Sequence, residues 1–225
     1  MANGVSYDFH LLPSGLMNPD CLNLIGSGVV VHVPTFFSEL ETIEKKGLKN
    51  VHERIFISDR CHIDFDLHCA VDQAEEIELG ANSIGTTKRG IGPCYASTAT
   101  RSGITMSEMF HPEVFERRLR SLAAGYKKRF GDALVYDVDA EIERFKGYRE
   151  RLAHYVVDAV AFVNDAQRRN ARVLIEGSQA LMLDVNYGTC TSIPTVPRRR
   201  RLNEPGPHSS TKPFAGCCRL VELKR

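Results

Sequence analysis

The sequence predicts an α/β fold in which helices cover a mostly parallel sheet. Short runs of β-branched and aromatic residues alternate with longer stretches whose apolar residues recur at helical spacing, as expected of strand–helix–strand units. The composition is that of a globular chain, because 43% of the 225 residues are hydrophobic and 25% are charged. A net charge of +1 is too balanced for the chain as a whole to be a nucleic-acid-binding protein.

The first strand is predicted at residues 29–33, a valine-rich run that ends before Pro34. Thr35 is a suitable N-cap for a following helix, and Gly47 suits its C′ position. Four apolar side chains of this helix fall on one face and are expected to be buried: Phe36, Phe37, Leu40 and Ile43.

A second strand is predicted at 54–58 and a helix at 64–79. Residues 80–103 contain five glycines and no periodicity, so we expect an irregular region there. Pro112 opens a helix whose buried stripe consists of Val114, Phe115, Leu119, Leu122 and Tyr126.

Two further helices are predicted at 139–152 and 155–168, the second ending at Asn170. A third, buried strand follows at 172–176. These elements complete the predicted order of alternating strands and helices.

The composition of the sequence changes after residue 189. Residues 190–225 contain prolines, the Arg198–Arg201 tetrad and eight cations against two acids, which gives a net charge of +6 and leaves 1 − 6 = −5 for residues 1–189. No helical or strand period is evident in 190–225, so we expect residues 1–189 to form the folded domain and residues 190–225 to be a disordered tail.

Cysteine usage and hydropathy indicate the compartment. Seven cysteines stand at irregular spacings without a CxxC pair, which favours reduced thiols over a disulfide framework. The longest apolar run, 28–34, is too short to span a bilayer. We therefore expect a soluble, cytoplasmic protein with no membrane partner.

The most informative stretch is Ile84-Gly-Thr-Thr-Lys-Arg-Gly-Ile-Gly-Pro93. Its glycines allow close backbone approach, its threonines offer hydroxyls, and Lys88 and Arg89 supply positive charge, which are the components of an anion cradle. The pattern is not that of a Walker A loop. A glycine-rich surface loop without a ligand explains the same residues equally well.

Three other stretches offer candidate sites. Gln179 follows the predicted strand at 172–176, where an amide could contact a base, although a capping turn is an equal alternative. The pairs Cys61-His62 and His68-Cys69 fit a partly buried segment better than a zinc site. The Arg198–Arg201 tetrad is better explained as an unstructured basic tail than as a nucleic-acid contact.

Taken together, the motifs resemble the adenylosuccinate synthetase family. The resemblance runs in order from about residue 3 to residue 189 and includes the highly specific glycine-rich run. Its matching stretches are Tyr7–Gly15, Leu24–His32, Lys45–Asn50, Ile55–Arg60, Ile84–Pro93, Ile175–Gln179 and Leu183-Asp184.

The resemblance implies a helix-covered sheet related to P-loop nucleotide-binding folds, and a two-stage ligase reaction. GTP, with Mg²⁺, phosphorylates the 6-oxygen of IMP, and the amine of L-aspartate then displaces that phosphate. By resemblance, Thr87 binds the IMP 5′-phosphate, Arg101 reaches that phosphate from the other subunit of a homodimer, and Gln179 contacts IMP beside its base.

The sequence also departs from the family pattern. The Gly-Asp-Glu-Gly-Lys-Gly-Lys and Asn-Ala-Gly-His-Thr segments, which the resemblance associates with the catalytic Asp and His, Mg²⁺ and GTP phosphates, have no counterpart in these residues. After Tyr187-Gly-Thr189 the family pattern stops. We therefore expect no catalytic residue, no metal ligand and no GTP-binding segment here, and consider an inactive fragment with part of the IMP and dimer site as the alternative to an active ligase.

Overall fold

The computed structural model describes residues 4–83, 85–177 and 218–223, with backbone alone in the last range. The strands are β1 (Cys21–Ile25), β2 (Val30–His32), β3 (Ile55–Ser58), β4 (His62–Asp64), β5 (Val156–Val157), β6 (Arg172–Gly177) and β7 (Cys218–Leu223). The α-helices are α1 (Val33–Lys45), α2 (Asp66–Leu79), α3 (Ile91–Ala99), α4 (Met106–Met109), α5 (Pro112–Phe130), α6 (Val138–Ala153) and α7 (Ala159–Arg168). Short 3₁₀ helices lie at Ser14–Met17, Gly80–Asn82 and Gly131–Ala133.

The described strands form two sheets. The larger has the order β5-β3-β1-β7-β6, and the smaller pairs β2 with β4. Pairing is parallel for β1–β3, β3–β5 and β2–β4, and antiparallel where β7 lies between β1 and β6. The predicted mostly parallel α/β architecture is thus confirmed.

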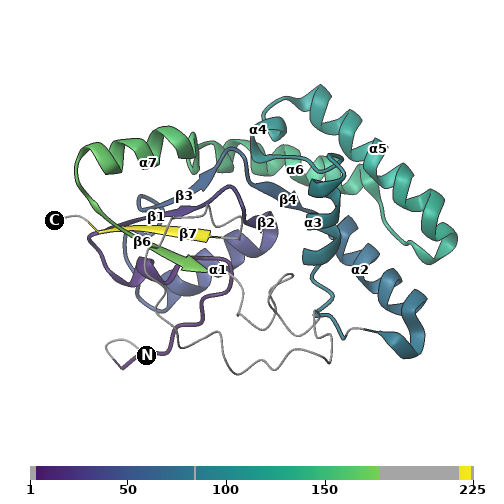
Figure 1. Ribbon diagram of the computed structural model, residues 1–225, viewed down its shortest axis with the longest axis horizontal. Coiled ribbons are helices and arrows are strands. Elements are labelled where there is room, and N and C mark those ends of the chain that lie inside the picture. The colour runs from purple at the N-terminus through teal and green to yellow at the C-terminus, as the bar shows by residue number, and fades with distance from the viewer. Residues whose placement is uncertain (1–3, 84, 178–217, 224–225) are drawn as a thin grey trace, which may run out of the picture.

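Helices α2, α3, α4 and α5 gather at one end of the molecule, away from strands β6 and β7 (Figure 1). Rings from several elements meet in the core, where Phe65 contacts Phe145 and Phe115 with centroid distances of 5.2 and 6.0 Å. On the larger sheet, Phe162 of α7 packs on Phe56 of β3 at 5.2 Å. The contacts of Phe65 with Phe115 and Phe145 hold the start of α2 against α5 and α6, and α2 carries the candidate site.

Most of the prediction for helix α1 is confirmed. All four apolar side chains of its predicted face are buried, and Gly47 adopts a φ of +98° directly after the C-cap. The amide of Gly47 donates to Glu44 O and that of Leu48 to Ile43 O, which are the two bonds of a Schellman motif. The predicted cap was wrong, because the helix begins at Val33 and Thr35 Oγ1 instead contacts His32 Nδ1 at 2.7 Å.

The helix predicted at 155–168 begins later. Asp158 caps α7 by accepting hydrogen bonds from the amides of Val160 and Ala161, so residues before it lie outside the helix. Val156 and Val157 add a short strand beside β3. Asn170 has a φ of +51° just beyond the C-cap, as its predicted role at the helix end requires.

Several of the described elements were not predicted, and β1, α3 and β4 are examples. Strand β1 is centred on a polar residue, the buried Asn23, whose Nδ2 donates to Cys21 O at 3.1 Å. Helix α3 lies within the glycine-rich region expected to be irregular, and β4 within residues flanking the predicted helix at 64–79. Short elements with polar or glycine-rich sequences have little local periodicity, so only their packing reveals them.

Two expectations about the C-terminal part need correction. Strand β6 was predicted to be buried, but Val173, Leu174 and Ile175 are exposed, and β6 has a neighbouring strand on one side only. No strand was expected after residue 189, yet 218–223 forms β7, whose register places Val221 opposite both Asn23 and Leu174. Backbone pairing on both sides can form a strand without a strong sequence pattern. The domain boundary at 189 stays a prediction, and the Arg198–Arg201 tetrad lies outside the described residues.

In the described part of the chain, no helix is long and apolar enough to cross a membrane. The described cysteines at 21, 61, 69 and 94 are free thiols.

A buried carboxylate on α1 ties the N-terminal segment to the fold. Glu39 is 8% exposed and accepts hydrogen bonds from the backbone amides of His10 at 2.7 Å and Leu11 at 2.9 Å. We predict that Glu39→Ala lowers the free energy of unfolding by about 2–4 kcal/mol, since hydrogen bonds to charged groups contribute about 1.5–3 kcal/mol each.

Urea denaturation of Glu39→Ala and of a control variant, Glu41→Ala, measures the free energy of unfolding. Glu41 is on the same helix but exposed, so its replacement should change stability by less than about 0.5 kcal/mol. Equal losses in the two variants would contradict the role of Glu39.

Candidate anion-binding site

The glycine-rich run is anchored to α2 through one buried carboxylate. Asp72 is 6% exposed, and its Oδ1 accepts from Thr86 Oγ1 at 2.8 Å while its Oδ2 accepts from the Gly90 amide at 3.1 Å. The amide of Gly85 donates to Glu76 Oε2 at 2.9 Å. Both ends of the segment 86–90 are therefore fixed to α2.

Gly90 begins α3 at a position where only glycine fits. Its φ is +77°, and a Cβ there would lie 2.7 Å from the backbone nitrogen of Cys69 and the carbonyl carbon of His68. Real Cβ atoms do not approach backbone so closely, so α3 starts in direct contact with α2.

The three residues between these anchors are exposed. Thr87, Lys88 and Arg89 present a hydroxyl and two cations, and none of these side chains has a hydrogen bond or ion pair with the described residues. Lys88 has a φ of +55°, a left-handed conformation that longer side chains rarely adopt. The run thus presents unpaired donors on a fixed frame, as an anion cradle requires.

Arg101 lies at the opposite end of α3. It follows the C-cap Thr100 with a φ of +62°, and the amides of Arg101 and Ser102 donate to Thr98 O and Ser97 O in a Schellman motif. Glycine or asparagine is usual at this C′ position. Gly103 completes the turn against His62, whose Cδ2 would lie 2.8 Å from an added Cβ.

Arg101 lines a cavity of about 550 Å³ that is open to solvent. The lining residues come from α2, α3, α5 and the turn after α3: Glu75, Ala96, Thr100, Arg101, Ser102, Arg118, Ser121, Leu122, Gly125, Tyr126 and Arg129. Thr87 is not among them. The structure therefore places Thr87 and Arg101 at opposite ends of α3, whose nine residues span about 14 Å at 1.5 Å per residue.

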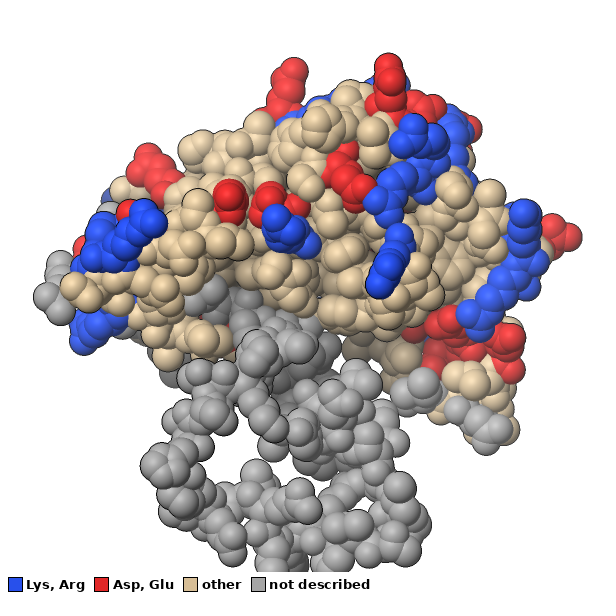
Figure 2. Space-filling model, turned by 45° about the horizontal axis from the view of Figure 1, so that its top comes forward, with Lys and Arg blue, Asp and Glu red and all other residues tan. Residues whose placement is uncertain are grey.

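Charges around the cavity are largely paired. Figure 2 shows basic side chains gathered toward the end of the molecule formed by α5, with acidic side chains among them. Arg118 pairs with Glu108, and Arg129 contacts Glu75 at 3.0 Å. Among the described residues Arg101 has no carboxylate partner, so its guanidinium is the cavity's available cation.

Gln179, the third predicted binding residue, lies outside the described residues. The last residue of β6 is Gly177, and Glu176 accepts hydrogen bonds from the amide and hydroxyl of Ser14 at 3.0 and 3.1 Å. The role of Gln179 at the site therefore stays a prediction.

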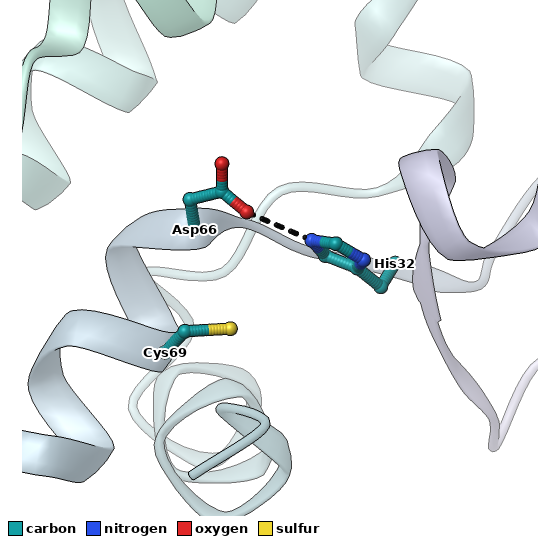
Figure 3. A group of neighbouring side chains, drawn as sticks. All are labelled: His32, Asp66 and Cys69. Atoms are coloured by element: carbon teal, nitrogen blue, oxygen red, sulfur yellow. Dashed lines mark hydrogen bonds and ion pairs between the residues drawn. The ribbon is translucent and has the colours of Figure 1, made fainter.

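Figure 3 shows a group of potential metal ligands, with His32 facing Asp66 and Cys69 of α2. Both ring nitrogens of His32 are engaged, Nε2 by Asp66 Oδ1 at 2.9 Å and Nδ1 by Thr35. The hydrogen bond from His32, together with Arg144 at 2.6 Å, lowers the pKa of Asp66 to about 2. A cation between His32 and Asp66 would have to replace their hydrogen bond and lie close to the positive charge of Arg144, so we assign no metal to this group.

A second group, Asp64, His68 and Cys94, is fully buried. The Phe65 amide donates to His68 Nδ1 at 3.0 Å, which uses the lone pair of that nitrogen. Asp64 Oδ1 lies 3.3 Å from the same nitrogen, yet neither Asp64 oxygen has a hydrogen-bond partner among the described residues. Burial therefore raises the pKa of Asp64 despite the neighbouring His68.

Cys61 and His62 do not join either group. The Cys61 thiol donates to Gly26 O at 3.0 Å in the core, and burial lowers the pKa of His62. Asp72 and Arg118, which hold the two ends of the candidate site, were not found from the sequence. Each is one polar residue among many on a helix, and no local pattern distinguishes it.

The described strands and helices define an α/β protein with a mostly parallel, helix-covered sheet, to which a glycine-rich, cation-bearing loop is fixed. The chain belongs to the adenylosuccinate synthetase family, whose model matches residues 1–197. This confirms the family and the fold class indicated by the sequence motifs.

Relatives agree with this assignment. The chain is 66% identical over 189 residues to adenylosuccinate synthetase of Pyricularia oryzae and 64% identical to that of Neurospora crassa, in each case over 84% of this chain. It spans 45% and 44% of the lengths of those relatives. A solved structure of fully ligated adenylosuccinate synthetase from Plasmodium falciparum is similar with a TM-score of 0.74 and 34% identity, over 83% of this chain and 43% of that one.

The buried carboxylate of Asp64 yields a prediction about pH. Because its pKa in the folded chain is raised, ionisation disfavours folding, and the penalty grows as the pH rises from the unfolded pKa to the folded one. We predict that Asp64→Asn is more stable than the parent at pH 7 by about 1 kcal/mol or more, and that the gap shrinks toward pH 4. Urea denaturation at both pH values measures it, and a parent more stable at pH 7 would contradict it.

The left-handed conformation of Arg101 yields a second prediction. Both Arg101→Gly and Arg101→Ala remove the guanidinium, but alanine retains the strain of a positive φ while glycine relieves it. We expect the glycine variant to be more stable by about 1 kcal/mol, which corresponds to a melting temperature about 2–4 °C higher. Equal melting temperatures in calorimetric scans would show that the strain is absent.

Proposed function

We propose that this chain supplies part of the IMP site of an adenylosuccinate synthetase. That enzyme, a cytoplasmic ligase of purine nucleotide synthesis, joins L-aspartate to IMP and converts GTP into GDP and phosphate. Membership of the family and the arrangement of the glycine-rich run on α2 support this proposal. No nucleic acid or membrane is involved.

In this reaction the γ-phosphoryl group of GTP is transferred to the 6-oxygen of IMP. The amine of L-aspartate then attacks carbon 6, forming a C–N bond, and the 6-oxygen leaves with the phosphate. The described residues act at the other end of the nucleotide, where they bind and orient it. A fixed 5′-phosphate restricts the position of the base, so it contributes to rate through orientation.

Thr87 and Arg101 have complementary roles at that phosphate. The Thr87 hydroxyl donates a hydrogen bond to a phosphate oxygen, while a guanidinium neutralises the charge with geometry that suits phosphate. In one chain these residues lie beyond opposite ends of α3, whose nine residues span about 14 Å by the helical rise. That separation supports a homodimer in which Arg101 of the partner subunit reaches the phosphate bound by Thr87.

Mg²⁺ and GTP are expected from the family, and the carboxylates beside the described loop are already engaged in hydrogen bonds. Asp72 and Glu76, the carboxylates beside the run, already accept hydrogen bonds from Thr86, Gly90 and Gly85. We therefore assign no metal ligand to this chain. Gln179 stays in the proposal as a contact beside the base.

The alternative function is IMP binding without turnover. Neither the Gly-Asp-Glu-Gly-Lys-Gly-Lys nor the Asn-Ala-Gly-His-Thr pattern occurs in the 225 residues, and these are the segments assigned to acid–base chemistry. Losses of such groups commonly reduce rates by orders of magnitude.

We predict that the 225-residue chain by itself forms no adenylosuccinate above an enzyme-free blank. The assay supplies IMP, GTP, Mg²⁺ and L-aspartate and follows adenylosuccinate by its absorbance. The full-length Pyricularia oryzae relative serves as the positive control. Turnover by the 225-residue chain would rule out the alternative and show that other residues perform the acid–base steps.

IMP binding tests the phosphate site directly. We predict that Thr87→Ala and Arg101→Leu each weaken IMP binding by about tenfold or more, because a charge-assisted hydrogen bond contributes about 1.5–3 kcal/mol. Titration calorimetry of IMP into each variant measures this. Lys128→Ala, a change of one exposed cation outside the cavity lining, is the control and should bind as the parent does.

Mixing the two variants tests the shared site. A heterodimer of a Thr87→Ala chain and an Arg101→Leu chain has one site with both groups intact, so the mixture should recover binding at half the sites of heterodimers. If both single variants bind as the parent does, the glycine-rich run is a connector and the proposed site is wrong.

A further inference from the structure

Arg118 of α5 contacts the backbone of the turn that presents Arg101. Its Nη2 donates to the carbonyl oxygen of Arg101 at 3.2 Å and to that of Gly103 at 2.7 Å. Its Nη1 forms an ion pair with Glu108 of α4. One guanidinium thus joins the turn after α3 to two other helices.

Glu108 is itself held in place. Its Oε2 accepts from the Thr105 amide at 2.8 Å and from the Thr105 hydroxyl at 3.0 Å, in a capping box at the start of α4. The contacts of Thr105 and Arg118 lower the pKa of Glu108, although partial burial opposes them. Glu108 therefore stays ionised and orients the Arg118 fork toward the turn.

The turn needs such support because Arg101 has a left-handed backbone. An arginine with a φ of +62° costs conformational energy, and neighbouring contacts must hold it there. The side chain of Arg101 is exposed and unpaired among the described residues, so it does not anchor itself. Among the described residues, the side chain that donates hydrogen bonds to this backbone from outside the turn is that of Arg118.

We propose that Arg118 is a positioning residue, which holds the backbone of Arg101 so that its guanidinium projects toward the phosphate site of the partner subunit. This inference rests on the proposed function, because it assigns Arg118 to the same half of the shared site as Arg101. Lysine cannot replace it, since one ammonium group cannot reproduce the planar fork that joins Glu108 to two carbonyls.

Chain mixing distinguishes this role from a general structural one. Arg118→Ala alone should weaken IMP binding about fivefold to tenfold in titration calorimetry. Mixed with Thr87→Ala, it should recover binding, because the heterodimer contains one site with an intact Thr87 and a well-held Arg101. Mixed with Arg101→Leu, it should not recover, since both sites then lack a correctly placed Arg101.

Arg120→Ala is the matched control. Arg120 is two residues further along α5 and pairs with Glu116 and Asp139 at the surface, so its loss should leave IMP affinity within twofold of the parent. Arg118→Lys is the second variant, which retains an ion pair with Glu108 and should still show weakened binding with the same mixing pattern. If Arg118→Ala does not fold, the binding and mixing results of Arg118→Lys test the role of Arg118.

The inference would be overturned if both Arg118 variants bound IMP as tightly as the parent. It would also be overturned if mixing an Arg118 variant with the Arg101→Leu chain restored binding, or if each Arg118 variant failed to recover with either the Thr87→Ala or the Arg101→Leu chain. Failure of the proposed function is separate from these. It would be seen without any Arg118 variant, as parental IMP binding by Thr87→Ala and Arg101→Leu chains.

Discussion

The candidate site depends on the buried carboxylate of Asp72. Its two oxygens bind the hydroxyl of Thr86 and the amide of Gly90, so the exposed residues between them are presented from a fixed frame. The same contact sets the start of α3 against α2, where Gly90 leaves no room for a side chain. The length of α3 then determines where Arg101 lies.

The two ends of α3 are supported differently. At its start, the side chains of Thr87, Lys88 and Arg89 have no partner among the described residues, and the groups that anchor the loop lie on α2. At its end, Arg101 adopts a conformation that favours glycine, and the fork of Arg118 bonds to the turn from α5. Because the nine residues of α3 separate these ends, we propose that the two groups belong to different sites of a dimer.

Among the described residues, buried charges differ in whether they have hydrogen-bond partners. Glu39 accepts from backbone amides of the N-terminal segment and ties that segment to α1. Arg54 donates to the carbonyls of Leu16 and Asn18 at 3.0 and 2.7 Å and ties them to the start of β3. Asp64 has no such donors, and its ionisation opposes folding. The difference follows from whether a buried charge finds hydrogen-bond partners.

The sequence by itself determined the elements whose information is local. The periodic apolar faces of α1, α5 and α6, the valine strand β2, and the helix ends at Gly47 and Asn170 all follow from side-chain spacing and backbone preference. The glycine-rich run gave the family, and through that resemblance Thr87, Arg101 and Gln179. Tertiary structure alone decided β1, α3 and β7, the anchoring by Asp72 and the support of Arg101 by Arg118. These depend on contacts between residues far apart in the chain, and such contacts leave no periodic pattern in the sequence around them.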